Sequence, residues 1–275
     1  MLLVISKSPT IRSLMMIRQI KHLLLFILLA VSSHAEETPT ASHEGKRSEL
    51  HVYLLIGQSN MAGRGIISDE HKQFPEKVFL LNAEGVFEPA THPLNQYSTI
   101  GKPIELQKQN IGYNFARVMR SSRPEAAVGL VVNARGGSGI EHWARGTPYY
   151  KEAIQRVALA RKQGTLRGIL WHQAERNSGN PEGYDKKLAQ LIHDLRKDLE
   201  DESLPFVAGQ IIDRPDTKAI NDLIAALPSQ VPHTGYVSSE GLTAMDRWHF
   251  DETSLLKLGE GYAREMLKLQ KVATP

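Results

Sequence analysis

Cysteine is absent from the 275 residues of this chain. The protein can therefore form no disulfide or thiolate metal site, and it has neither a cysteine nucleophile nor a lipoprotein attachment residue. The eleven histidines are scattered without a His-Glu-x-x-His or similar pair, so no metal site is expected. The segment Gly57–Gly63 lacks the Lys-Ser/Thr of a phosphate-binding loop. We expect no cofactor, and a fold that depends on its hydrophobic core.

Long apolar runs are also missing, and the longest has only nine residues, Leu23–Val31. A membrane-spanning helix needs about 20 apolar residues, so this run is too short to be an anchor. Arg18 and Lys21 precede it, and Ser33-His34-Ala35 supplies the small residues that a signal peptidase recognises. The pattern predicts a signal peptide over residues 1–35 that is cleaved after about Ala35.

Cleavage at this position predicts a bacterial protein that is secreted or periplasmic and has no stable membrane anchor. Met16 would begin a more typical signal peptide than Met1, and the sequence leaves the true start open between the two.

A strong charge of one sign is absent as well, because the net charge of the whole chain is only +3. Residues 1–35 hold four basic residues and no acidic one, so the remainder has 29 basic and 30 acidic residues, a net charge of −1. A near-neutral chain of this kind gives no support for a nucleic-acid partner.

Residues 36–49 are polar and without periodicity, which predicts a linker, and residues 271–275 form a short tail. In residues 50–270, short apolar runs alternate with amphipathic helical patterns. This alternation indicates a single α/β domain with a central parallel sheet. The strand candidates are His51–Ile56, Ala127–Asn133, Gly168–His172 and Phe206–Ile212, with Lys77–Asn82 and Thr234–Ser238 as weaker ones. The helix candidates are Ile111–Arg120, Pro148–Gln163, Glu182–Glu200 and a closing helix with apolar positions from Leu255 to Leu269.

The first strand candidate leads directly into Gly57-Gln58-Ser59-Asn60-Met61-Ala62-Gly63. A serine just after a buried strand has its hydroxyl at the carboxyl edge of the sheet, where backbone N–H groups favour a developing oxyanion. A helix cap with flanking turn glycines is the alternative reading of these residues. The segment differs from the Gly-x-Ser-x-Gly elbow of α/β-hydrolases, because Met61 stands where the second glycine would be.

Near the other end of the chain stands Asp246-Arg247-Trp248-His249-Phe250. A spacing of three residues lets a carboxylate and an imidazole lie on the same side of one turn. Asp246 can then accept a hydrogen bond from Nδ1–H of His249, which leaves Nε2 free to take a proton from a serine. An isolated Asp-x-x-His is usually an ion pair on the protein surface. The position of Asp246 and His249 just before the last helix favours a catalytic role instead.

Two segments between these motifs follow strand candidates. Arg135-Gly136-Gly137-Ser138-Gly139 can offer a glycine N–H to an oxyanion, or it is merely a flexible turn. Trp171-His172-Gln173-Ala174-Glu175 places a side-chain amide at Gln173, which could donate a further hydrogen bond to an oxyanion or simply face water.

The four segments, in this order, resemble the SGNH hydrolases, and most of all the branch with sialate O-acetylesterase-like domains and the acetylxylan esterases of carbohydrate esterase family six. The resemblance covers about residues 50–270. It implies a three-layer α/β/α sandwich and a catalytic triad of Ser59, His249 and Asp246. It also implies an oxyanion hole made of the Ser59 N–H, the Gly137 N–H and the Gln173 amide. Ala174, Gly139 and Arg176 depart from the family pattern and leave the shape of the substrate pocket open.

Other side chains of these segments could support the triad or touch the substrate, namely Gln58, Asn60, Glu175 and Trp143. Glu175 could orient Gln173 or the loop that carries Ser59, or it could be solvated. Trp143 could stack on a sugar ring or cover the core. His172 is expected to pack or hydrogen-bond, because His249 has the better-placed acid partner.

The function expected from the sequence is removal of O-acetyl groups from an acetylated carbohydrate through an acetyl-enzyme. Two alternatives remain: a lipid or thioester hydrolase on the same scaffold, and a non-catalytic carbohydrate-binding protein. The loops expected around Ser59 cover residues 62–69, 136–146 and 174–183. They are rich in Gly, Arg, Asn, Glu and Ser, which favours a sugar over an alkyl chain.

Overall fold

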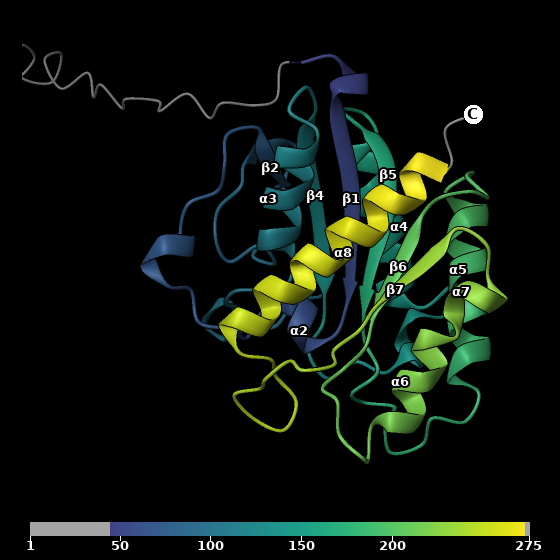
Figure 1. Ribbon diagram of the computed structural model, residues 1–275. Coiled ribbons are helices and arrows are strands. Elements are labelled where there is room, and N and C mark those ends of the chain that lie inside the picture. Colours follow the sequence, from purple (N-terminus) through teal and green to yellow (C-terminus); the bar gives the residue numbers. More distant parts are fainter. Residues whose placement is uncertain (1–44, 273–275) are drawn as a thin grey trace, which may run out of the picture. The chain divides into compact units, whose positions relative to one another are not determined.

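The computed structural model describes residues 45–272, whose strands form one seven-stranded sheet. The order across it is β3-β2-β4-β1-β5-β6-β7, and all neighbouring pairs are parallel except β2 with β3 (Figure 1). The strands are β1 (Leu50–Gly57), β2 (Val78–Leu81), β3 (Phe87–Pro89), β4 (Ala127–Ala134), β5 (Thr165–His172), β6 (Phe206–Gly209) and β7 (Thr234–Val237).

Helices connect the parallel strands. The α-helices are α2 (Ser59–Ala62), α3 (Gly112–Ser122), α4 (Pro148–Ala160), α5 (Tyr184–Asp198), α6 (Lys218–Ala225), α7 (Leu227–Gln230) and α8 (Glu252–Val272). Short 3-10 turns are η1 (Arg47–Glu49), η2 (Asp69–His71), η3 (Ile104–Leu106) and η4 (Ile140–Trp143).

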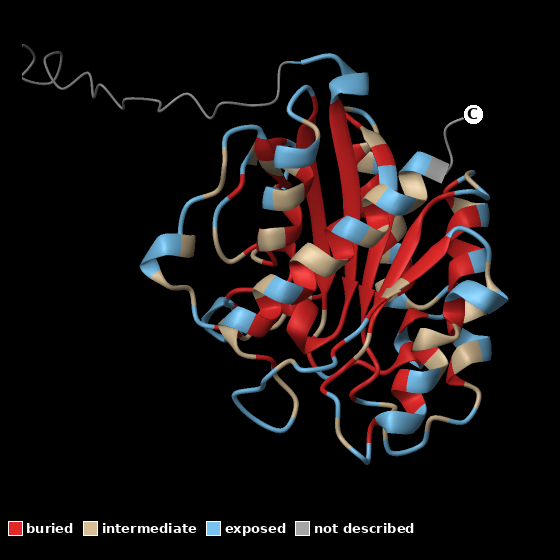
Figure 2. Ribbon diagram, in the orientation of Figure 1, coloured by how far each residue is buried: buried red, intermediate tan, exposed pale blue. Residues whose placement is uncertain are grey.

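The central strand β1 is buried along its whole length, because helices cover both faces of the sheet (Figure 2). Successive strand residues point to opposite faces, so Leu54 and Ile56 join one hydrophobic core, whereas Tyr53 and Leu55 join the other. The two cores are separated by the sheet itself.

Different helices fill the two cores. Val157 of α4 and Leu188 of α5 pack in the first, whereas Phe115 of α3 and Leu258 of α8 pack in the second. Helix α8 crosses the face of the sheet diagonally in Figure 1 and contacts α3 beside it. The predicted three-layer α/β/α sandwich with one domain is therefore confirmed.

All six predicted strands exist, with small differences at their ends. β5 begins three residues before Gly168, and β6 ends at Gly209 rather than at Ile212. The antiparallel strand β3 and the helices α6 and α7 had no sequence prediction. β3 has three residues and α7 has four, which are too few to show a periodicity, and α6 has only eight.

The predicted signal peptide over residues 1–35 and most of the predicted linker lie outside the described residues. Within residues 45–272, no helix is long and apolar enough to cross a membrane.

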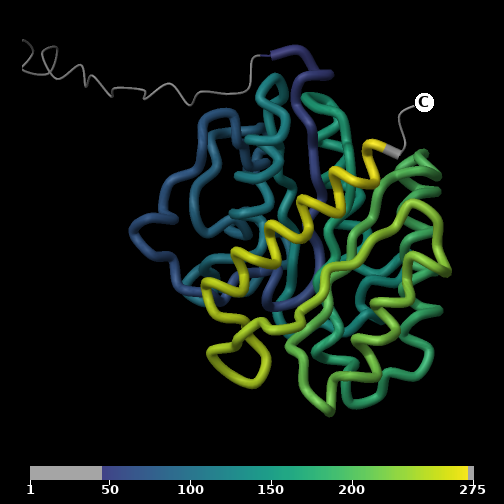
Figure 3. Tube along the Cα trace, viewed as in Figure 1, coloured from purple at the N-terminus to yellow at the C-terminus, as the bar shows by residue number. Residues whose placement is uncertain are grey.

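Carboxyl ends of the parallel strands meet at one edge of the sheet, and the chain turns there after β1, β4 and β5. The loop before α8 reaches the same edge, and in Figure 3 its yellow trace runs near the end of the purple trace of β1. Phe250 of that loop donates a backbone hydrogen bond to Asn60, 190 residues earlier in the chain. An edge where several loops converge is the usual ligand site of such a fold.

Candidate active site

Ser59 stands at the carboxyl end of β1 as the first residue of α2. The chain leaves the strand through Gly57, whose φ is +138°, and a Cβ there would lie 2.2 Å from the carbonyl oxygen of His172 on β5. Only glycine allows β1 and β5 to approach so closely at this point. The turn presents Ser59 at the wall of an open cavity.

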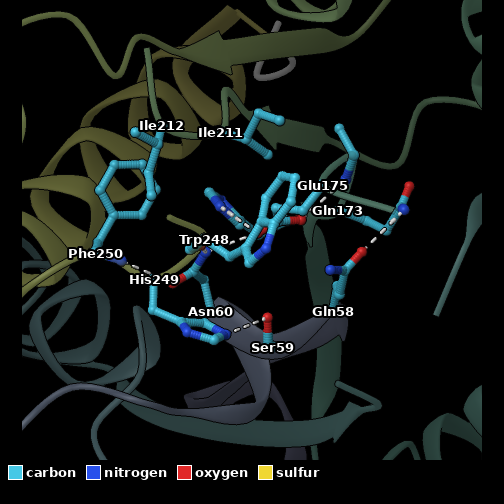
Figure 4. A network of polar contacts seen from close by, with 12 residues as sticks. Gln58, Ser59, Asn60, Gln173, Glu175, Ile211, Ile212, Trp248, His249 and Phe250 are labelled. Atoms are coloured by element: carbon cyan, nitrogen blue, oxygen red, sulfur yellow. Dashed lines mark hydrogen bonds and ion pairs between the residues drawn. The ribbon is translucent and has the colours of Figure 1, made fainter. Parts of the chain in front are cut away.

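Ser59, His249 and Asp246 form a continuous hydrogen-bonded chain, part of which Figure 4 shows. The Oγ of Ser59 is 3.1 Å from Nε2 of His249, and Nδ1 of His249 is 2.7 Å from Oδ2 of Asp246. The other carboxylate oxygen of Asp246 accepts backbone N–H bonds from Trp248 at 2.7 Å and His249 at 2.9 Å. These contacts fix the imidazole with one nitrogen toward the carboxylate and the other toward the hydroxyl.

The electrostatics of Asp246 suit this arrangement. Partial burial raises the pKa of its carboxyl, but the hydrogen bonds from the His249 ring and from the two backbone N–H groups outweigh it. The pKa of Asp246 consequently lies below its ordinary value, and the group is ionised at neutral pH.

Asn60 holds the loop of His249 on both sides. Its Oδ1 accepts the backbone N–H of Phe250 at 3.2 Å, and its Nδ2 donates to the backbone oxygen of Trp248 at 3.0 Å. Asn60 directly follows the serine, so one side chain ties the position of the imidazole to that of the hydroxyl. The sequence named Asn60 as a supporting residue without indicating this contact.

Glu175 holds the side chain of Asn60 by a hydrogen bond. Its Oε1 accepts a hydrogen bond from Asn60 Nδ2 at 2.7 Å, and its Oε2 accepts one from the backbone N–H of Ala174 at 3.2 Å. Burial raises the pKa of Glu175 to about 7, although these hydrogen bonds partly oppose the effect. Of the two roles considered for Glu175, the contacts fit the second, because its side chain holds Asn60 in the segment that carries Ser59 and makes no hydrogen bond with Gln173.

His172 is buried and has no access to the cavity. Its Nδ1 is 3.0 Å from the Tyr262 hydroxyl, and burial lowers the pKa of its ring to about 3. A neutral ring 3.9 Å from Glu175 forms no ion pair with it. The packing role predicted for His172 is confirmed.

Two of the three residues predicted to supply oxyanion donors, Ser59 and Gly137, line the cavity. Gly137 has φ of +83°, and a Cβ there would meet nothing within 4 Å, so the glycine is required by backbone conformation and not by packing. The space that a Cβ of Gly137 would occupy is empty, and it is therefore available to a substrate.

Gln173 does not reach the cavity. Its side chain is fully buried, and its Nε2 donates to Asn177 Oδ1 at 2.8 Å, to Ser138 O at 3.1 Å and to Gln58 Oε1 at 3.2 Å. An amide nitrogen has two hydrogens, and three acceptors within the protein already compete for them. The prediction that Gln173 donates directly to an oxyanion is therefore wrong for this structure.

Trp143 lies away from the cavity and packs in the hydrophobic core, so of the two roles considered for it, covering the core is the one that the structure shows. It is fully buried, packs edge-to-face on Trp171 at 5.6 Å and donates its indole N–H to Ser138 Oγ at 3.2 Å. The aromatic residue of the cavity is Trp248, which lies over Ser59 in Figure 4. Sequence reasoning had the Asp246–Phe250 segment but assigned no role to its tryptophan.

The cavity has a volume of about 680 Å³ and is open to solvent. It is lined by Gln58, Ser59, Arg64, Lys102, Leu106, Gly136, Gly137, Glu175, Arg176, Ser178, Gly179, Asp216, Arg247, Trp248 and His249. Four of these residues are basic (Arg64, Lys102, Arg176 and Arg247), two are acidic (Glu175 and Asp216), and two have large apolar side chains (Leu106 and Trp248). Among the charged lining residues, the basic ones therefore outnumber the acidic ones.

Arg64 is a basic residue of the cavity to which the sequence analysis assigned no role. Its Nη1 donates to the backbone oxygen of Leu106 at 2.6 Å, which fixes the guanidinium. A Cβ on Gly136 would lie 2.6 Å from Arg64 Nη2 and 3.6 Å from Ser59 Cβ, so Nη2 sits beside the nucleophile. Asp216 is paired with Arg214 and Arg247. Arg64 forms no ion pair among the described residues, and the carboxylate that attracts it is that of Asp246.

Within residues 45–272, no group of three or more His, Asp or Glu side chains could hold a metal ion. The chemistry that the arrangement offers is that of an activated serine beside backbone N–H donors.

Known proteins resemble this chain in sequence and in fold. The model of a family described as carbohydrate esterase, sialic acid-specific acetylesterase, matches residues 49–268. A probable carbohydrate esterase from Arabidopsis thaliana is 32% identical over 176 residues, which are 57% of this chain and 66% of that protein. The matched segment thus spans slightly less than two thirds of that relative.

Solved structures share the fold. A protein from Arabidopsis thaliana superposes with a TM-score of 0.73 at 26% identity, over 80% of this chain and 98% of that one. A carbohydrate acetylesterase from Xanthomonas citri superposes with a TM-score of 0.60 at 17% identity, over 82% of this chain and 57% of that one. At the lower identity, the likeness concerns the fold alone.

Proposed function

The chain belongs to the carbohydrate esterase family of sialic acid-specific acetylesterases, and we propose that it is a serine esterase that removes O-acetyl groups from carbohydrates. One observation carries the proposal: the hydrogen-bonded chain Ser59–His249–Asp246 ends in a serine hydroxyl at the wall of an open, polar cavity. A non-catalytic sugar-binding protein would have no need of this arrangement.

In the first step, His249 Nε2 takes the proton of Ser59 as Oγ attacks the acetyl carbonyl carbon. The carbonyl electron pair moves to oxygen, where the N–H groups of Ser59 and Gly137 stabilise the negative charge. Collapse of this intermediate breaks the bond to the sugar oxygen, which takes the proton from His249. The products are an acetyl-serine and a free sugar hydroxyl.

In the second step, water gives a proton to His249 and attacks the acetyl-serine by the same route. Collapse releases acetate and returns the proton to Ser59. Asp246 remains ionised throughout, and it stabilises the imidazolium that exists between the two proton transfers.

Acetate release from an acetylated sugar is the direct test. Wild-type protein should release it, and Ser59→Ala should lower turnover by about 1,000-fold or more with the fold unchanged. Activity on p-nitrophenyl esters should fall from acetate to octanoate, because Leu106 is the one large aliphatic residue in the cavity lining. Near-normal turnover by Ser59→Ala would contradict the proposal, and activity that increases with chain length would favour a lipid esterase.

The charges of the cavity favour a sugar that carries a carboxylate in addition to its acetyl ester. Among the described residues, Arg64, Lys102 and Arg176 line the cavity without an ion-pair partner. Of the two acidic lining residues, Asp216 is paired with arginines and Glu175 is buried. A cleft lined by uncompensated charge of one sign concentrates substrates of the opposite sign.

Two matched variants test this preference. Lys102→Gln and Arg176→Gln should lower kcat/KM on an O-acetylated acidic sugar by about 10-fold each and change activity on an O-acetylated neutral xylo-oligosaccharide little. Lys162→Gln removes the same charge from an exposed position outside the cavity and should have no effect. Equal losses on both substrates would reject the carboxylate preference.

A further inference from the structure

The amide of Gln58, the residue before the nucleophile, has one definite orientation. Its Oε1 accepts a hydrogen bond from Gln173 Nε2 and another from the backbone N–H of Arg176, both at 3.2 Å. Both neighbours are donors at these contacts. If the amide were turned round, its NH₂ group would face two donors, so the oxygen must lie on this side.

The nitrogen of the same amide is consequently directed to the other side. Gln58 lines the cavity together with Ser59 and Gly137, and Nε2 makes no hydrogen bond with any residue of the described chain 45–272. In Figure 4 the amide nitrogen of Gln58 is turned away from Gln173, toward the side where Ser59 and Trp248 lie. The Nε2 group of Gln58 is thus an N–H donor that has no protein partner and faces the reaction site.

Gln173 is excluded from this position by its own contacts. Besides its three acceptors, its Oε1 accepts the Tyr184 hydroxyl at 3.0 Å, so both ends of the amide are bound inside the protein. A side chain held in this way can fix a neighbour, but it has no hydrogen available for a substrate.

We propose that Gln58 donates the side-chain hydrogen bond of the oxyanion hole and that Gln173 acts as a positioning residue that keeps the Gln58 amide oriented. The assignment rests on the proposed esterase function. The carbonyl oxygen of the acetyl group becomes negative when Ser59 attacks, and it then accepts from the N–H groups of Ser59, Gly137 and Gln58. A preoriented donor stabilises this charge without any reorganisation during the reaction.

Gln58→Glu is the sharpest variant, because it keeps an acceptor for Gln173 and Arg176 and replaces only the donor. Gln58→Met removes the donor without adding a charge. With p-nitrophenyl acetate, both should lower kcat by about 100-fold or more and change KM little, because the donor acts mainly in the transition state. Thermal unfolding of each variant confirms that the fold is retained.

A double substitution separates the two glutamines. Gln173→Ala should lower kcat by about 10-fold, because Arg176 still holds the Gln58 oxygen. The double variant Gln58→Met/Gln173→Ala should be no slower than Gln58→Met alone, since Gln173 acts only through Gln58. Losses that multiply would make Gln173 an independent donor and overturn the assignment.

The outcome for wild-type protein distinguishes this assignment from the function itself. If the wild-type protein hydrolyses acetyl esters and both Gln58 variants keep a near-normal kcat, the proposed role of Gln58 is rejected. The esterase function is then retained. Absence of wild-type turnover on every acetyl ester rejects the function, and the assignment with it. If Gln58→Met fails to fold, Gln58→Glu decides, because it preserves both hydrogen bonds to the Gln58 oxygen.

Discussion

At the scale of single residues, hydrogen bonds determine which polar side chains face the substrate and which lie behind it. Asn60 and Glu175 are buried, yet they set the position of His249 through the backbone of Trp248 and Phe250. Burial of the Glu175 carboxylate is unfavourable, because no cation lies beside it and the neighbouring His172 is neutral.

The protonation of Glu175 makes stability depend on pH. Its pKa of about 7 in the folded protein lies above its ordinary value of 4.5, so folding favours the protonated form. The stability contributed by this proton is fully present below about pH 4.5 and is lost as the pH rises through about 7.

Glu175→Gln should therefore stabilise the protein at pH 8, by at most about 3 kcal/mol, and give little difference at pH 4.5. Urea unfolding at the two pH values measures the effect, with Glu240→Gln at an exposed position as the control. A stability difference that does not depend on pH would contradict a titrating Glu175.

At the scale of secondary structure, the turn that carries Ser59 depends on how closely β1 approaches β5. Gln58 N donates to His172 O at 2.8 Å, one residue after Gly57 pairs with His172. The same carbonyl lies where a Cβ of Gly57 would stand. The strand contact and the position of the nucleophile are consequently one geometric feature.

Gly57→Ala should destabilise the protein by about 2–4 kcal/mol, because the new methyl group collides with backbone that cannot move without separating the strands. Gly179→Ala is the matched control for stability, since a Cβ at that position meets nothing within 4 Å. Chemical denaturation of both variants measures the difference. Equal denaturation midpoints for the two variants would show that β1 and β5 can move apart with little loss of stability.

At the scale of the whole molecule, charge is distributed unevenly. The chain after residue 35 has a net charge of −1, yet four basic residues line the cavity. The positive potential is therefore local to the site, and it attracts an acidic substrate without making the whole surface cationic.

Export is a separate proposal for the whole chain, because residues 1–35 lie outside the described part. We propose that the signal peptide is removed after Ala35 when a bacterial host exports the protein. Mass spectrometry of the exported protein should find Glu36 at the N-terminus. Full-length protein in the membrane fraction would contradict this processing.

The sequence by itself determined the α/β class, the parallel strands and the residues of the Ser59, Asp246 and His249 chain. Alternating apolar runs and helical periodicity depend on local burial, and they are visible in the order of residues. The Asp246 and His249 contact is also local, because only two residues separate them.

Tertiary structure alone decided which glutamine faces the cavity and which tryptophan lines it. Gln58 and Gln173 have the same side chain, and each follows a strand at the same edge of the sheet. Their roles differ because Asn177, Ser138 and Tyr184, from other segments, engage the Gln173 amide, whereas the Gln58 nitrogen has no such partner in the described chain. Contacts between distant segments leave no periodic pattern in a sequence, so the orientation of a buried amide is decided only when the chain has folded.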